Sequence, residues 1–122
     1  MNRIALGTVQ FGLSYGIANQ AGQVTRPEAK DMLQLALAND IDMLDTAIAY
    51  GDSEICLGEA GTQGLKVVTK LPTMPNDCAD VSAWVQQQVS ASLSRLGVAA
   101  IYGLLIHRSE QLLGPYGDEL FQ

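Results

Sequence analysis

The stretch TRPEAKDMLQLALANDIDMLD, from Thr25 to Asp45, indicates how this chain folds. Thr25 and Glu28 have the spacing of a capping box, a proline occupies the first turn, and apolar residues then recur at helical spacing. We therefore predict a helix over residues 27–39, followed almost at once by a short apolar strand over residues 41–45. A helix that leads directly into a buried strand is typical of a βαβ unit with parallel strands.

The same alternation continues on both sides of this unit. Further strands are expected over residues 3–8, 66–71 and 101–107, helices from Ser53 to about Gly61 and from Asp80 to Gly97, a glycine-rich loop over residues 10–22, and the start of another helix after residue 109. This order predicts an α/β protein with a parallel sheet. A doubly wound sheet and half of a barrel both fit the pattern. The absence of G-x-G-x-x-G after the first strand weakens the case for a dinucleotide-binding doubly wound sheet.

Composition narrows the class of protein further. The 122 residues, 48% hydrophobic and 16% charged, suffice for one domain over residues 1–122, but a closed eight-stranded barrel takes about 250. The net charge of −6 and the lack of a basic cluster exclude nucleic acid as an expected partner. No apolar stretch approaches the roughly 20 residues of a membrane span, so we expect a cytoplasmic protein. Cys56 and Cys78 lack metal-ligand spacing and are expected to be free thiols, with no metal site.

Candidate catalytic side chains follow the predicted strand ends: Asp45, Tyr50, Lys70 and His107. Enzymes built of alternating strands and helices place their chemistry at that end of the sheet. Reduction of a carbonyl needs a hydride donor, which no side chain can be, and an acid that protonates the developing alkoxide. A tyrosine can be that acid when a lysine held by a carboxylate favours its charged form, and a histidine can orient the carbonyl. Taken singly, each residue is more simply a solvated strand end or a core residue.

Taken together, these residues follow the pattern of one family. Residues 45–58 read DTAIAYGDSEICLG and contain the pattern DTAxxYGxSExxLG. With Leu6-Gly7-Thr8, the strand that ends in Val68-Thr69-Lys70, and Leu105-Ile106-His107-Arg108, they resemble the aldo-keto reductases in order and spacing. The resemblance covers nearly the whole chain but only the N-terminal half of the family's (β/α)8 TIM barrel. It therefore implies four parallel strands that alternate with helices.

The resemblance implies an oxidoreductase that reduces a small-molecule aldehyde or ketone with NADPH, or else with NADH. Tyr50 would be the general acid and Lys70 would pair with Asp45. The resemblance also implies cofactor contacts from Gly7, Thr8 and Asp45, and substrate contacts from Gln10, Phe11 and His107. Outside this set, Trp84 is expected on the side of its helix that faces the core, and Glu54 and Glu59 are expected on a solvated helix face.

The pattern departs from the family in one respect. Members of the family stack the nicotinamide on an aromatic side chain and clamp the adenosine phosphate with basic residues from later strands, which have no counterpart here. We therefore expect that a C-terminal half or a second copy of the chain completes the barrel. The alternative function is a non-catalytic binding or assembly module that keeps the reductase scaffold.

Overall fold

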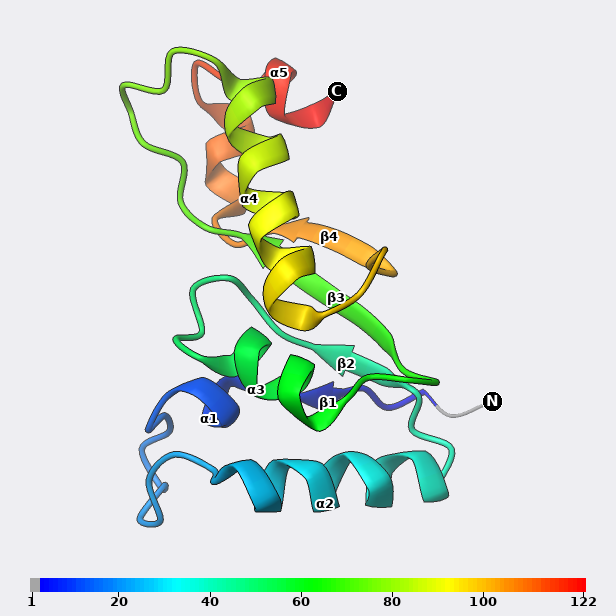
Figure 1. Ribbon diagram of the computed structural model, residues 1–122. Coiled ribbons are helices and arrows are strands. Elements are labelled where there is room, and N and C mark those ends of the chain that lie inside the picture. Colours follow the sequence, from blue (N-terminus) through cyan, green and yellow to red (C-terminus); the bar gives the residue numbers. More distant parts are fainter. Residues whose placement is uncertain (1–2) are drawn as a thin grey trace.

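A parallel sheet of four strands forms the centre of the molecule. The computed structural model describes residues 3–122. The strands are β1 (Leu6–Gly7), β2 (Met43–Asp45), β3 (Lys66–Leu71) and β4 (Gly103–Ile106), and they lie in that order in the sheet, as Figure 1 shows. In register, Leu44 pairs with Leu6 on one side and with Val67 on the other. The predicted array of parallel strands is confirmed.

Helices connect the strands, and the predicted capping residues mark the starts of α2 and α4. They are α1 (Val9–Gly12), α2 (Arg26–Ala38), α3 (Ser53–Ala60), α4 (Val81–Leu96) and α5 (Gly117–Phe121), and a 3-10 helix spans Ser109–Leu113. The capping box between Thr25 and Glu28 is complete at the start of α2. The side chain of Asp80 accepts from the backbone N–H of Ala83 at 2.9 Å, and Gly97 ends α4 with a left-handed φ of 66°.

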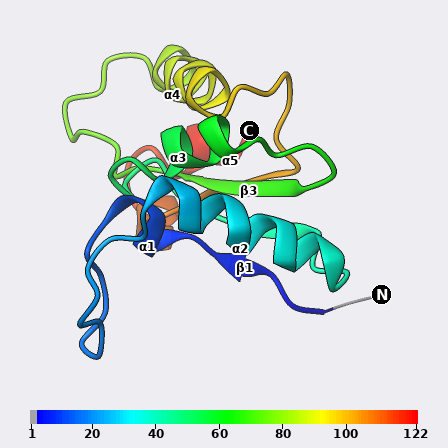
Figure 2. The same cartoon turned by 60° about the horizontal axis from the view of Figure 1, so that its bottom comes forward.

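The core lies between one face of the sheet and the helices. In β3, Val67, Thr69 and Leu71 are buried while Lys70 is only partly so, because successive side chains of a strand point to opposite faces. The buried face packs against α2, α3 and α4, and Figure 2 shows α3 and α4 on the same side of β3. The buried cluster consists of Phe11, Ala29, Leu33, Leu44, Cys56, Leu57, Val67 and Leu96.

Four segments differ from the sequence prediction. The strand β2 begins at Met43, two residues later than predicted. The strands β1 and β4 are shorter than expected because they lie at the two edges of the sheet and each pairs on one side only. Leu104 and Leu105, expected to be covered on both faces of the sheet, are exposed at this edge. The predicted loop over residues 10–22 begins with the last three residues of α1, because residues 9–12 close one helical turn directly after β1.

Two exposed carboxylates have pKa values that are shifted by neighbouring groups. The ammonium nitrogen of Lys66 lies 2.7 Å from Asp42, and this hydrogen bond lowers the pKa of Asp42 and raises that of Lys66. At the start of α2, hydrogen bonds from the backbone and the hydroxyl of Thr25 lower the pKa of Glu28. Both carboxylates are therefore more stable in their charged form in the folded chain.

Within residues 3–122, no helix is both long enough and apolar enough to cross a membrane. The same residues contain no group of three or more His, Cys, Asp or Glu side chains that could hold a metal ion. Cys56 is buried and Cys78 partly buried, and both are free thiols, as the sequence predicted. The cytoplasmic location stays a prediction.

Candidate active site

The ammonium group of Lys70 is held by three acceptors. Its nitrogen lies 2.8 Å and 2.9 Å from the two carboxylate oxygens of Asp45 and 2.8 Å from the backbone oxygen of Thr46. These three bonds use all three N–H groups of a lysine. The side chain of Lys70 is 16% exposed and that of Asp45 41% exposed, so the positive charge is partly shielded from water and fixed in position.

The rings of Tyr50 and His107 lie beside this charge. The Lys70 nitrogen is 5.1 Å from the centroid of the Tyr50 ring, within the range of a cation–π contact. The His107 ring meets the Tyr50 ring edge-on, with centroids 5.7 Å apart and planes at 86°. The Nδ1 atom of His107 is buried and has no hydrogen-bond partner in the described chain. The structure thus brings together all four residues that the sequence singled out, and their chemical roles stay predictions.

Buried hydroxyl groups fix the strand ends that carry this site. The Ser53 hydroxyl lies 3.0 Å from the hydroxyls of Thr8 and Thr46 and donates to the Thr8 backbone oxygen at 2.9 Å. The Thr8 hydroxyl donates to the backbone oxygen of Asp45 at 3.0 Å. Ser53 was expected to cap its helix. It is instead the first helical residue after Asp52, and its side chain ties α3 to the ends of β1 and β2.

The turn that carries Tyr50 packs tightly against α1. A Cβ atom at Gly12 would lie 1.8 Å from the backbone oxygen of Tyr50 and 2.4 Å from the backbone nitrogen of Ser53. Only a glycine permits this approach of two backbones. The turn itself needs Gly51, whose φ of 52° lies in the left-handed region.

Glu54 is the residue whose place the sequence prediction misjudged. It was expected on a solvated helix face, but it is 2% exposed. Its carboxylate accepts from the hydroxyls of Thr69 at 2.7 Å and Ser92 at 2.6 Å and from Nε of Arg95 at 2.8 Å. Such a buried carboxylate is stable only because it is fully hydrogen-bonded and paired with a cation. Glu59, on the same helix, is exposed as expected and pairs with Arg26.

The sequence did contain a signal for this burial. Glu54 lies three residues before Leu57 on α3, and residues at that spacing share a helix face. Thr69 alternates with Val67 and Leu71 on the buried face of β3, and Ser92 lies four residues before Leu96 on α4. Polar residues at buried positions of three successive elements indicate a hydrogen-bonded cluster.

Of the residues expected near a cofactor, Gly7 has open space around its Cα atom. It pairs in register with Asp45, and a Cβ atom at Gly7 would meet nothing within 4 Å. Thr8 has no exposed surface. In this structure Thr8 therefore supports the strand end and presents no group to a ligand.

Of the residues expected near a substrate, His107 lies beside Tyr50, whereas Gln10 and Phe11 belong to α1. Gln10 is exposed and donates its side-chain amide to the backbone oxygen of Tyr15 at 2.9 Å. Phe11 is buried in the hydrophobic core and offers almost no exposed surface in this structure. Trp84, outside this set, was expected to face the core and is half-buried on α4.

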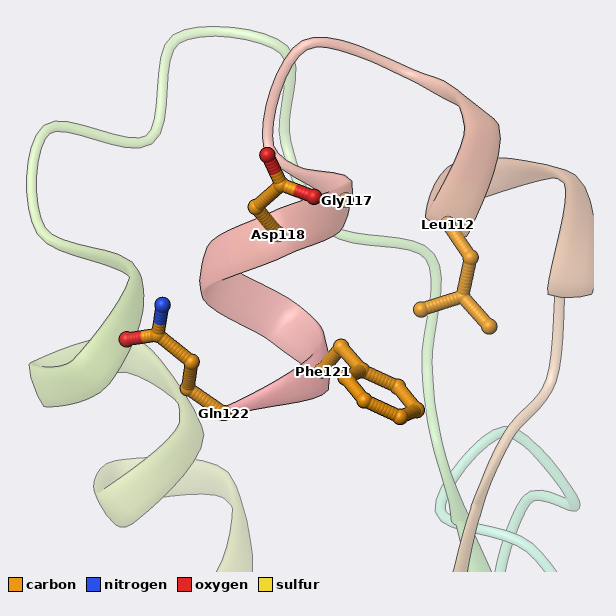
Figure 3. Close-up of a pocket in the computed structure, with 5 residues that line it drawn as sticks. All are labelled: Leu112, Gly117, Asp118, Phe121 and Gln122. Atoms are coloured by element: carbon orange, nitrogen blue, oxygen red, sulfur yellow. The ribbon is translucent and has the colours of Figure 1, made fainter.

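A pocket near the C-terminal end of the described chain is lined by none of the candidate site residues. Figure 3 draws the residues that line it, which come from the 3-10 helix, from α5 and from the residue after α5. It is lined by Leu112, Gly117, Asp118, Phe121 and Gln122.

A parallel sheet whose strands follow the chain order, with helices on one face and polar residues at the strand ends, is the architecture of half a (β/α)8 barrel. The sequence of residues 3–113 matches the aldo/keto reductase family. The chain therefore belongs to this family, and its four strands and their helices correspond to the N-terminal half of the family's barrel.

Solved structures agree with this assignment. Two structures from Pseudomonas aeruginosa, assigned as aldo-keto reductases, are each 30% identical to this chain, with TM-scores of 0.75 and 0.71. They cover 96% and 91% of this chain, which covers 48% and 44% of theirs. The holo form of an aldo-keto reductase from Bacillus halodurans is 21% identical, with a TM-score of 0.59 over 80% of this chain and 33% of its own, and shares the fold. A comparison with curated proteins found no match.

Proposed function

We propose that the protein is an oxidoreductase that reduces an aldehyde or a ketone, with NADPH as the hydride donor and NADH as the alternative donor. One observation carries the proposal. The ammonium group of Lys70 is fixed by both carboxylate oxygens of Asp45 and by the Thr46 backbone beside the ring of Tyr50. A structural ion pair has no need of a tyrosine and a histidine at its side, whereas acid catalysis on a carbonyl can use the tyrosine as proton donor and the histidine to orient the carbonyl.

Each side chain has a role that follows from its chemistry. The hydroxyl of Tyr50 gives its proton to the carbonyl oxygen, and the adjacent charge of Lys70 stabilises the phenolate that forms. Asp45 holds that charge in place before the reaction begins, so no reorganisation is needed when the negative charge develops. His107, beside Tyr50, hydrogen-bonds the carbonyl oxygen and orients it.

The dinucleotide would supply the hydride that is added to the carbonyl carbon. The residues present suit its nicotinamide end, because Gly7 leaves open space beside Asp45 at the end of β1. Gly7 and Asp45 would hold the nicotinamide and its ribose, with Thr8 fixing the strand end behind them. The chain spans about half the length of the solved structures it matches, and contacts to the adenosine end are not proposed for its residues.

The test replaces the acid and leaves the rest of the site intact. In the protein that contains this chain, Tyr50→Phe should lower kcat for a panel of aldehydes and ketones by about 100- to 10,000-fold, the usual contribution of a general acid. The dissociation constant for NADPH, followed by quenching of Trp84, should stay unchanged because the hydroxyl acts on the substrate. Tyr102→Phe is the matched control, since Tyr102 is exposed near the start of β4. Equal activity of the two variants would refute the assignment of Tyr50.

A second function is favoured by the exposed sheet edge. Leu104 and Leu105 are apolar and exposed on β4, which suits a binding or assembly module that retains the reductase scaffold. Such a module would bind a cofactor or partner equally well with Tyr50→Phe and would turn over no carbonyl. The same pair of variants therefore separates the two functions.

A further inference from the structure

The buried carboxylate of Glu54 connects three elements around the candidate active site. It belongs to the first turn of α3 and accepts hydrogen bonds from Thr69 on β3 and from Ser92 and Arg95 on α4. Donor and acceptor lie 2.6–2.8 Å apart in each bond, which is the short range of bonds to a charged acceptor. Within residues 3–122, the Glu54 carboxylate makes no hydrogen bond or ion pair with the four residues of the site, so its influence on them has to pass through the backbone.

The first route leads to Lys70. Thr69 precedes it on β3, and the two side chains point to opposite faces of the sheet. When Glu54 holds the Thr69 hydroxyl on the helix side, it fixes the backbone from which the Lys70 side chain extends on the other side. The Lys70 nitrogen must stay within hydrogen-bond distance of three acceptors, so a small rotation of this strand would break at least one of those bonds.

The second route leads to Tyr50. The backbone N–H of Ser53 donates to the backbone oxygen of Tyr50 at 3.0 Å, and Glu54 is the next residue. The hydroxyl of Ser53 fixes this turn to β1 and β2, and the carboxylate of Glu54 fixes it to β3 and α4. The start of α3 is thus anchored on both sides. The relative position of Tyr50 and Lys70 depends on both anchors.

We propose that Glu54 is a positioning residue, whose buried carboxylate sets the start of α3 against β3 so that the Lys70 ammonium stays between Asp45 and the ring of Tyr50. This inference rests on the proposed function and deepens it by naming a residue that acts through others. It predicts that loss of the Glu54 charge disturbs Lys70 and Tyr50, although neither side chain is hydrogen-bonded to it.

The first readout needs no activity. In the folded chain, the three bonds of the Lys70 ammonium should slow the exchange of its protons with water enough for a ¹⁵N-edited NMR signal, assigned by its loss in Lys70→Met. Glu54→Gln should broaden this signal beyond detection, because the carboxamide is a weaker acceptor for Thr69 and leaves Arg95 without its counter-charge. Glu59→Gln, an exposed position on the same helix, should leave the signal sharp.

The second readout is catalytic. Glu54→Gln should lower kcat by about 100-fold and change KM by less than about threefold, because misplacing a catalytic group costs the chemical step more than it costs binding. Leu33→Ala removes a buried core side chain from α2, away from the cluster, and controls for lost stability. It should lower the melting temperature and leave both the Lys70 signal and kcat unchanged.

Thr69→Val keeps the shape of the threonine and removes one donor to Glu54. It replaces Glu54→Gln in both measurements if that variant does not fold. It should move both readouts in the same direction by a smaller amount. A folded Glu54→Gln or Thr69→Val variant with an unaltered Lys70 signal and unaltered kcat would overturn the proposal. A wild-type protein that reduces no carbonyl would refute the proposed function, while the Lys70 signal would still decide the role of Glu54.

Discussion

Replacement of Gly12 by alanine is a direct test of the packing beneath Tyr50. The new methyl carbon would lie 1.8 Å from the backbone oxygen of Tyr50, 2.4 Å from the nitrogen of Ser53 and 2.9 Å from the nitrogen of Asp52. Ordinary contact begins near 3.4 Å, so α1 and the turn must separate by about 1.6 Å. The three atoms belong to the backbone, and no change of side-chain rotamer can relieve the collision.

Two consequences follow from that displacement. The extra methyl group should cost about 1–3 kcal/mol of the free energy of unfolding, as overpacking usually does. For a domain of this size that corresponds to a fall in melting temperature of about 4 °C for each kcal/mol. The carbonyl that moves belongs to Tyr50 itself, and a catalytic group displaced by about 1 Å loses about 100-fold in rate. Stability and kcat should therefore fall together.

Thermal unfolding followed by the fluorescence of Trp84, the single tryptophan, measures the first effect, and turnover of a carbonyl substrate measures the second. Gly7→Ala is the matched control for stability, because a Cβ atom there meets nothing within 4 Å. It should keep the wild-type melting temperature. A Gly12→Ala variant that melts together with Gly7→Ala would show that α1 does not press on the turn, and the argument for a glycine at this position would fail.

Three further substitutions test the core and the surface. Leu57→Ala removes a fully buried side chain and should cost about 2–5 kcal/mol in urea unfolding; an unchanged midpoint would contradict its place in the core. The hydrogen bonds from Thr25 lower the pKa of Glu28 in the folded chain. The charged carboxylate therefore stabilises the fold at pH values above its unfolded pKa. This stabilisation is lost as the pH falls through the folded pKa. Glu28→Gln should therefore be less stable than the wild type at neutral pH and equally stable in acid, as a series of melting curves will show; a deficit that persists in acid would refute the linkage. Asp42→Asn breaks the exposed pair with Lys66 and should lower the melting temperature only slightly at neutral pH, and less at high salt, because exposed pairs are weak and screened; a large fall that salt does not reduce would contradict this.

The sequence predicted the elements of the fold well wherever a local signal marks their ends. The capping box at Thr25, the cap at Asp80 and the left-handed Gly97 each act on backbone groups a few residues away, so the sequence alone locates them. The edge strands β1 and β4 were predicted too long. Their length depends on pairing partners that are distant in the sequence, and no local pattern reports those partners.

The sequence also predicted the candidate site only in part. Asp45, Lys70, Tyr50 and His107 were singled out because they follow predicted strand ends and together match the pattern of one family, and the structure brings their side chains together. Glu54 was misplaced because a charged residue is seldom fully buried, and its burial depends on donors from two later elements. Polar residues at inward-facing positions carried that information, but only as a group.

The neighbour relations of the strands bear on how the chain folds as it is made. Each strand of the sheet pairs with the one that precedes it in the sequence, so Leu6 meets Leu44, Leu44 meets Val67, and Val68 meets Gly103. Each strand after β1 thus finds its partner in the strand made just before it. Such a sheet can grow in the order of translation. The hydrogen bonds of Glu54 to α4 form late in that order, shortly before β4 brings His107 to the candidate site.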